Sequence, residues 1–214
     1  MINEVCMRGK GKLGIMSLTQ AEKGAAFAAL HKRDRAFIIP NPWDAGSARM
    51  LAHLGFEALA TTSAGYAFSA GRRDGKMSRE ETIAHVAMLV AATDLPVSAD
   101  LENGFGDAPE DAAETIRQGA AAGLAGGSIE DLPGRAGDGP YEIQHAADRI
   151  RAAVEVVRAL HTPFTLTARA ENYLVGRKDL KDTVARLQAY QDAGANVLYA
   201  PGLTTKEEIK AVVS

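Results

Sequence analysis

Pro96-Val97-Ser98-Ala99-Asp100 is the stretch from which the fold can be predicted, because it joins a short apolar run to a charged end. Five residues are too few for a helix, and the run is typical of a buried strand. A polar loop follows, and residues 108–122 then have the pattern of an amphipathic helix. Similar short runs recur at residues 36–40, 58–62, 126–130, 164–169 and 196–200.

Longer helical stretches separate these runs. Two of them begin with a capping-box spacing, Thr19 with Glu22 and Ser78 with Glu81, which satisfies free backbone donors at a helix start. Helices are expected at residues 19–31, 43–54, 78–93, 108–122, 141–160 and 179–193, and from about residue 204 onward. Six successive β-α units predict a parallel sheet with helical crossovers.

Polar residues end at least four of the predicted strands: Thr62, Asp100, Glu130 and Arg169. In a (β/α)8 barrel these positions converge on one mouth, whereas an open doubly wound sheet would gather them at a single crevice. We favour the barrel. Such a barrel usually needs about 250 residues. Six units therefore predict a ring that is incomplete at its C-terminus, either because the chain is truncated or because a partner subunit supplies the missing strands.

The composition is that of an ordinary globular domain, with 46% hydrophobic and 24% charged residues in 214. We expect one barrel domain over residues 16–214 and a disordered extension over residues 1–15. The net charge of −3 argues against a nucleic-acid partner, and no apolar run is long enough to cross a membrane. Because the single Cys6 cannot form a disulfide framework, a cytoplasmic location is expected.

Three acids are the first candidates for a functional site: Asp100, Glu102 and Glu130. Carboxylates gathered at one mouth would repel one another unless a cation lay among them. Ligands that offer only oxygen indicate Mg²⁺, or Mn²⁺, rather than zinc. The alternative is that these acids are solvated loop residues or helix caps.

Arg169 ends a predicted strand and should face the same mouth, where a guanidinium can bind a substrate carboxylate. Its alternative is a structural ion pair with Glu130 or Glu171. The small, hydroxylated turn that contains Thr62, Ser63 and Ala64 could bind a carboxylate through backbone N–H groups. The histidines fall at unrelated spacings and are expected at the surface: His31, His53, His85, His145 and His161.

Several segments, in this order, give the chain a family resemblance over residues 36 to about 203. They are Asn41-Pro42-Trp43-Asp44-Ala45-Gly46-Ser47-Ala48-Arg49, Thr62-Ser63-Ala64-Gly65, Pro96-Val97-Ser98-Ala99-Asp100, Gly104-Phe105-Gly106, Ser128-Ile129-Glu130-Asp131 and Ala168-Arg169-Ala170-Glu171. The chain resembles the isocitrate lyase / phosphoenolpyruvate mutase superfamily. The resemblance implies a (β/α)8 barrel, Mg²⁺ at its mouth and a homo-oligomer.

The resemblance also implies roles for individual residues. The metal would be held by Asp100, Glu102 and Glu130, with Asp74 as a further loop acid, and the catalytic residues would be Asp74, Glu130 and Arg169. Substrate would contact Trp43, Asp44, Thr62, Ser63, Ala64 and Arg169. One departure concerns residues 133–139, which lack the cysteine, lysine and histidine of the loop that supplies the acid/base in the family's lyases.

These implications lead to a Mg²⁺-dependent lyase or mutase. It would act on a small 2-oxo acid or enolpyruvate-type substrate through an enolate, as in oxaloacetate-type decarboxylation or a phosphoenolpyruvate mutase-like step. Two alternatives stay open. One is a catalytically idle barrel that binds 2-oxo acids, and the other is an unrelated phosphate-binding barrel.

Overall fold

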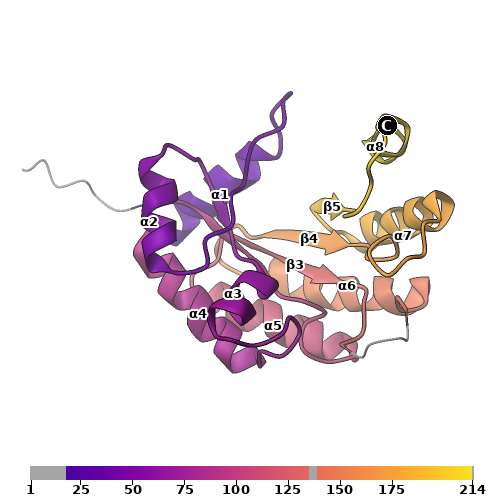
Figure 1. The fold of residues 1–214 in the computed structure, drawn as a ribbon, viewed down its shortest axis with the longest axis horizontal. Helices are drawn as coiled ribbons and strands as arrows, with labels where there is room; N and C mark the ends of the chain where they lie inside the picture. Colours follow the sequence, from indigo (N-terminus) through magenta and orange to yellow (C-terminus); the bar gives the residue numbers. More distant parts are fainter. Residues whose placement is uncertain (1–17, 135–138, 214) are drawn as a thin grey trace, which may run out of the picture.

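The computed structural model describes residues 18–134 and 139–213. The sheet in this part of the chain has five parallel strands in the order β1-β2-β3-β4-β5, and it curls into a half-barrel (Figure 1). The strands are β1 (Leu59–Ala60), β2 (Val97–Asp100), β3 (Gly126–Glu130), β4 (Thr165–Arg169) and β5 (Val197–Tyr199). Neighbouring strands pair in chain order, as successive β-α units require.

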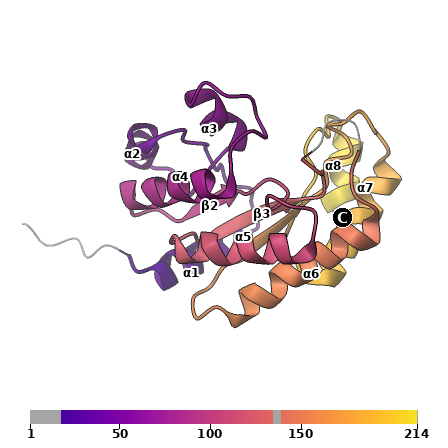
Figure 2. The ribbon, with the colours of Figure 1, turned by 90° about the horizontal axis from the view of Figure 1, so that it is seen from below.

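The helices cover the outer side of this curled sheet, where α4, α5 and α6 follow one another (Figure 2). Their bounds are α1 (Gln20–Leu30), α2 (Ala45–His53), α3 (Ser63–Ser69), α4 (Arg79–Ala92), α5 (Pro109–Ala121), α6 (Ile143–Ala159), α7 (Leu180–Ala193) and α8 (Lys206–Val213). Both predicted capping boxes are present, at Thr19 and at Ser78. No helix in the described ranges is long and apolar enough to span a membrane.

Two sequence-based expectations about individual elements were wrong. Residues 36–40 do not form a strand of the sheet. The carbonyl of Pro40 accepts one hydrogen bond from the N–H of Ala60, at 3.1 Å, but no ladder continues from it. The stretch after β1, expected as a loop, contains the short helix α3, which begins where the side chain of Thr62 accepts from the N–H of Gly65.

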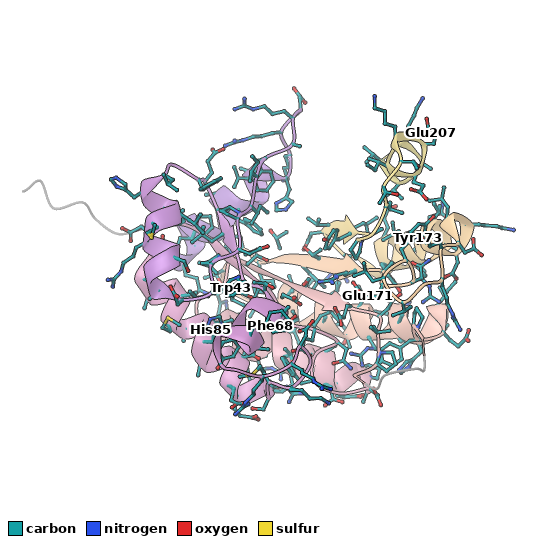
Figure 3. All side chains as sticks on the ribbon, in the orientation of Figure 1. Trp43, Phe68, His85, Glu171, Tyr173 and Glu207 are labelled. Carbon is teal, nitrogen blue, oxygen red and sulfur yellow. The ribbon has the colours of Figure 1, made fainter. Side chains whose placement is uncertain are left out.

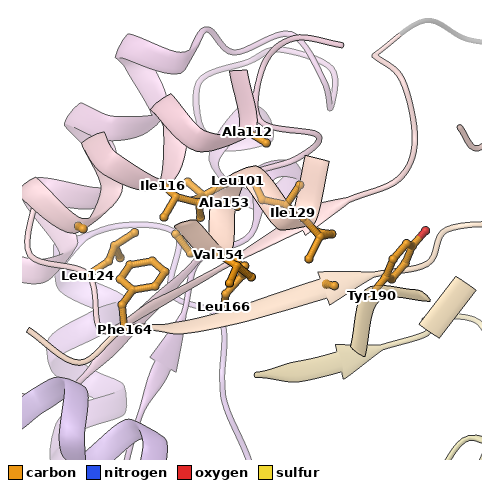
Figure 4. Close-up of a cluster of buried hydrophobic side chains, with 14 of the residues drawn as sticks. Leu101, Ala112, Ile116, Leu124, Ile129, Ala153, Val154, Phe164, Leu166 and Tyr190 are labelled. Carbon is orange, nitrogen blue, oxygen red and sulfur yellow. The ribbon is translucent and has the colours of Figure 1, made fainter. Parts of the chain in front are cut away.

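The core lies between the outer face of the sheet and helices α5 and α6 (Figure 4). Side chains alternate along each strand, so Ile129 and Leu166 are buried in this core while Ser128 and Thr167 face the opposite side. The opposite side is the interior of the half-barrel. Its polar character at the carboxyl ends of the strands creates the site described next.

Gly126, the first residue of β3, lies close against Thr165 of β4 and Phe27 of α1. A methyl group at this position would lie 2.6 Å from the carbonyl oxygen of Thr165 and 2.8 Å from the ring of Phe27. Only a residue without a Cβ fits there, because a backbone atom on one side and a buried ring on the other leave no room to move.

Candidate active site

The carboxyl ends of β2, β3 and β4 bring three charged side chains together. Arg169 is paired in register with Glu130, and Asp100 with Ser128. The guanidinium of Arg169 lies 3.7 Å from Asp100 (Nη1 to Oδ2) and 3.8 Å from Glu130 (Nε to Oε2). These side chains are 30 residues or more apart in the sequence, yet they form one charged cluster. The reason is that the carboxyl ends of neighbouring parallel strands lie at the same edge of the sheet.

Arg169 also forms the ion pair that was weighed as its alternative role. Its Nε–H donates to Oε1 of Glu171, a carboxylate that is only 3% exposed. The ring of Tyr199 lies beside the guanidinium, with 5.4 Å between the guanidinium carbon and the ring centroid. Three carboxylates and an aromatic ring thus surround one cation, which also lines the cavity on this side of the sheet.

The hydroxylated turn after β1 is attached to this cluster through Asp100. The N–H and the hydroxyl of Ser63 both donate to Oδ2 of Asp100, at 3.2 and 2.9 Å. The N–H of Ser63 is therefore directed at the protein's own acid rather than at open space. Thr62, the N-cap of α3, and Ala64 lie on either side of it.

A cavity of about 520 Å³ opens in front of the cluster. Its lining includes the predicted residues Thr62, Ser63, Ala64, Asp74, Asp100 and Arg169, together with Ser128, Thr167 and Tyr199. Glu102 lines a neighbouring cavity of about 570 Å³ with Gly75 and Arg79. Residues that line the two cavities are in contact, because the N–H of Glu102 donates to Oδ1 of Asp100 at 3.2 Å.

The crowding of carboxylates changes their protonation. Burial, together with the negative charges of Asp100 and Glu171, raises the pKa of Glu130 to about 9. Burial and the charges of Asp100 and Asp74 raise the pKa of Glu102 to about 7. Burial lowers the pKa of Arg169, but its carboxylate neighbours outweigh that effect and raise it above the usual value. The site therefore holds more carboxyl groups than its one arginine could balance if all of them were ionised.

This donor set fits Mg²⁺ or Mn²⁺ by its chemistry. Within the described ranges, no three acidic, histidine or cysteine side chains are gathered closely enough to form a ready-made metal cage. Mg²⁺ commonly takes one or two carboxylates and keeps several of its waters, so such a cage is not required. Burial and, after it, repulsion from neighbouring carboxylates raise the pKa values of Glu102 and Glu130, and a divalent cation would relieve the repulsion.

Trp43 and Asp44, expected to contact substrate, do not line the cavity. The carboxylate of Asp44 caps α2 by accepting from the N–H of Ser47 at 2.7 Å. Trp43 is 47% exposed and its indole packs against Gly65. Figure 3 shows Trp43 near His85 and Phe68, apart from Glu171. Both residues therefore make local contacts in this structure, and their expected contact with substrate stays a prediction.

His85 was expected at the surface, and that expectation was wrong because the residue is buried. It is 6% exposed, its Nε2 lies 2.8 Å from the carbonyl oxygen of Trp43, and its ring stacks on Tyr66 with centroids 3.9 Å apart. Burial lowers its pKa. A histidine at an ordinary helical position gave no sequence signal of these contacts.

Two buried residues near the site were not predicted, Asp131 and Arg149, and Glu171 was expected only as a possible ion-pair partner of Arg169. Asp131 belongs to a segment that carries the family resemblance, but its charge and spacing gave no reason to assign it a role. Arg149, on α6, is 1% exposed and donates to the carbonyls of Gly106 and Ala108 in the loop after β2. Its place in a helical pattern resembled that of any surface arginine.

Two expectations concern residues outside the described ranges. One is the disordered extension over residues 1–15, and the other is the departure at residues 133–139, of which 135–138 are not described. Both stay predictions.

Comparison with known proteins adds independent findings. The sequence profile of a family described as phosphoenolpyruvate phosphomutase matches residues 27–214. A crystal structure of a Burkholderia cenocepacia J2315 protein superposes with a TM-score of 0.89 at 64% identity, covering 91% of this chain and 70% of that one. Oxaloacetate acetylhydrolase, in complex with 3,3-difluorooxalacetate, gives a TM-score of 0.81 at 29% identity, covering 91% and 67%.

Among relatives of known activity, the 2-methylisocitrate lyase of Salmonella typhimurium is 30% identical over 189 residues, which are 85% of this chain and 63% of that one. The chain therefore spans about two thirds of the length of the proteins it matches.

Proposed function

Because the chain belongs to the phosphoenolpyruvate phosphomutase family, we propose that it is a Mg²⁺-dependent lyase or mutase, with Mn²⁺ as a substitute. Its substrate is a small 2-oxo acid or an enolpyruvate-type compound. The observation that carries this proposal is the position of Arg169, a lone arginine among acids at the cavity lined by Thr62, Ser63 and Ala64.

Arg169 binds the substrate carboxylate. Its Nε–H is held by Glu171, which leaves the outer N–H groups to form a charge-assisted pair with a carboxylate in the cavity. The hydroxyls of Ser128 and Thr167 line the same cavity and can donate to substrate oxygens. These contacts would orient the substrate before any bond breaks, and orientation alone lowers the barrier substantially.

Asp100, Glu102 and Glu130 are the proposed metal ligands, and Asp74 is close enough to Glu102 to raise its pKa. A divalent cation held there supplies Lewis-acid polarisation of the 2-oxo group. The protein's own contribution would be to hold the cation through these carboxylates while Arg169 binds the substrate carboxylate.

The chemistry follows from where negative charge develops. The bond that breaks joins the carbon next to the 2-oxo group to the departing group. Its electron pair remains on the pyruvate-like fragment, which becomes an enolate. Arg169 is fixed in place before this charge forms, which is the arrangement that stabilises a transition state most strongly. Carbon–carbon cleavage and phosphorus–carbon rearrangement share this requirement. Glu130 and Asp74, with Arg169, are the proposed catalytic residues.

Turnover of a panel of 2-oxo acids, including oxaloacetate and phosphonopyruvate, tests the proposal in the presence of Mg²⁺ and of EDTA. We expect metal-dependent turnover of at least one compound and its loss in Arg169→Met. Arg151→Met, at an exposed position on α6, is the matched control and should retain activity. Binding of these compounds without turnover would support an idle binding barrel and contradict the proposal.

A further inference from the structure

Behind Arg169 lies a buried network in which Asp131 is the central acceptor. Asp131 follows β3 directly and is 3% exposed. Its Oδ1 accepts from the backbone N–H of Glu171 at 2.8 Å. Its Oδ2 accepts from Arg186 Nη1 at 3.0 Å and from the hydroxyl of Tyr190 at 2.5 Å. One carboxylate thus joins the end of β3, the loop after β4 and helix α7.

Backbone contacts tighten the same junction. The N–H of Asp131 donates to the carbonyl of Arg169 at 3.1 Å, and its own carbonyl accepts from Tyr141 at 2.8 Å. Asp131 therefore bonds to the backbone on both sides of Ala170. The segment that carries Arg169 and Glu171 is held at two points by a residue that does not line the cavity.

Because the Glu171 backbone is held in place, its carboxylate can orient the side chain of Arg169. Glu171 lies at the carboxyl end of β4 (Figure 3), with its carboxylate on Nε of Arg169. A guanidinium is planar, so fixing its Nε–H edge fixes the direction of its two outer nitrogens. The position of the Glu171 backbone, set by Asp131, thus determines where the outer nitrogens of Arg169 point.

We propose that Asp131 and Glu171 are positioning residues that act in series to aim the guanidinium of Arg169 at the substrate carboxylate. The inference rests on the proposed function only in taking Arg169 as the substrate-binding cation. Asp131 fixes the backbone position of Glu171, and Glu171 in turn fixes the orientation of the Arg169 guanidinium.

Asp131→Asn tests the first step. Asparagine has one acceptor oxygen in place of two, and the cationic Arg186 and the hydroxyl of Tyr190 both donate to it, so its NH2 group is turned toward the N–H of Glu171 and that hydrogen bond is lost. Glu171→Gln tests the second step, because it keeps the shape and removes the charge that holds Nε. Tyr190→Phe is the matched control, since it removes one hydrogen bond from Oδ2 of Asp131 and leaves the bond to Glu171 intact.

Two measurements are made on each folded variant. The first is the ¹⁵N NMR signal of the Arg169 Nε–H, assigned by its loss in Arg169→Lys. The second is the affinity for oxalate with Mg²⁺ by calorimetry. We expect Asp131→Asn and Glu171→Gln to shift the signal and to weaken oxalate binding roughly tenfold, the loss of one charge-assisted hydrogen bond. Tyr190→Phe should leave the signal in place and the affinity within about twofold.

An Arg169 signal that is unchanged in Asp131→Asn, or changed equally by Tyr190→Phe, would overturn the proposal. Should Asp131→Asn fail to fold, an unchanged signal in Glu171→Gln would overturn it instead. If oxalate does not bind to the unaltered protein, the proposed function fails, while the NMR signal still decides whether the two acids orient Arg169.

Discussion

Replacing Glu130 by glutamine should stabilise the protein in the absence of metal. Glu130 lies at the end of β3 among Asp100, Glu171 and Glu102, and burial with these charges raises its pKa from 4.5 to about 9. The folded chain therefore holds a proton on this group up to a higher pH than the unfolded chain does. Consequently, the free energy of unfolding falls as the pH rises from about 4.5 to about 9.

The size of the effect follows from the same values. Each pH unit over which the folded state keeps a proton that the unfolded state has lost lowers the free energy of unfolding by about 1.4 kcal/mol. Between the ordinary value of 4.5 and pH 7 the cost reaches about 3 kcal/mol. Glutamine does not titrate, so Glu130→Gln removes the cost while keeping the side chain's shape.

Urea denaturation in EDTA at pH 5, 7 and 8.5 measures the effect. We expect the variant to gain stability over the unaltered protein as the pH rises, and Mg²⁺ to stabilise the unaltered protein more than the variant. Glu155→Gln, at an exposed position on α6, controls for the loss of a negative charge. Parallel pH profiles for the unaltered protein and Glu130→Gln would refute the reasoning.

Three further outcomes are expected from urea or thermal denaturation. Arg149→Leu should lower the free energy of unfolding by about 3 kcal/mol or more, because it leaves the backbone carbonyls of the loop after β2 without their buried donor. A decrease below about 1 kcal/mol would contradict this. Gly126→Ala should destabilise by about 1–3 kcal/mol, because its methyl group meets the Thr165 carbonyl, and an unchanged midpoint would contradict it. Ser78→Ala should cost about 0.5–2 kcal/mol, because Glu81 loses the cap acceptor for its N–H; Ser78→Asp, which can also cap, should restore most of it.

The sequence by itself determined the order and kind of the elements. Apolar runs of five residues predicted the strands, and 3.6-residue periodicity with capping boxes predicted most helices, because these signals come from local backbone and burial preferences. The curled parallel sheet followed, with Asp100, Glu130 and Arg169 at its carboxyl edge. Strand ends in a parallel sheet meet at one edge whatever the details of packing.

Only the tertiary structure decided what those residues touch. The strand expected at residues 36–40 lacks a ladder, since sheet pairing depends on a partner and not on the run itself. Asp44 has the charge of a binding residue, yet its carboxylate caps α2, and His85 is buried against Tyr66.

The same holds for the network behind the site. Asp131 and Glu171 are two acids among 27 acidic residues in the sequence. What distinguishes them is the exclusion of water and the direction of Arg169 and Arg186 toward them, and both arise from contacts between strands and helices that lie far apart along the chain.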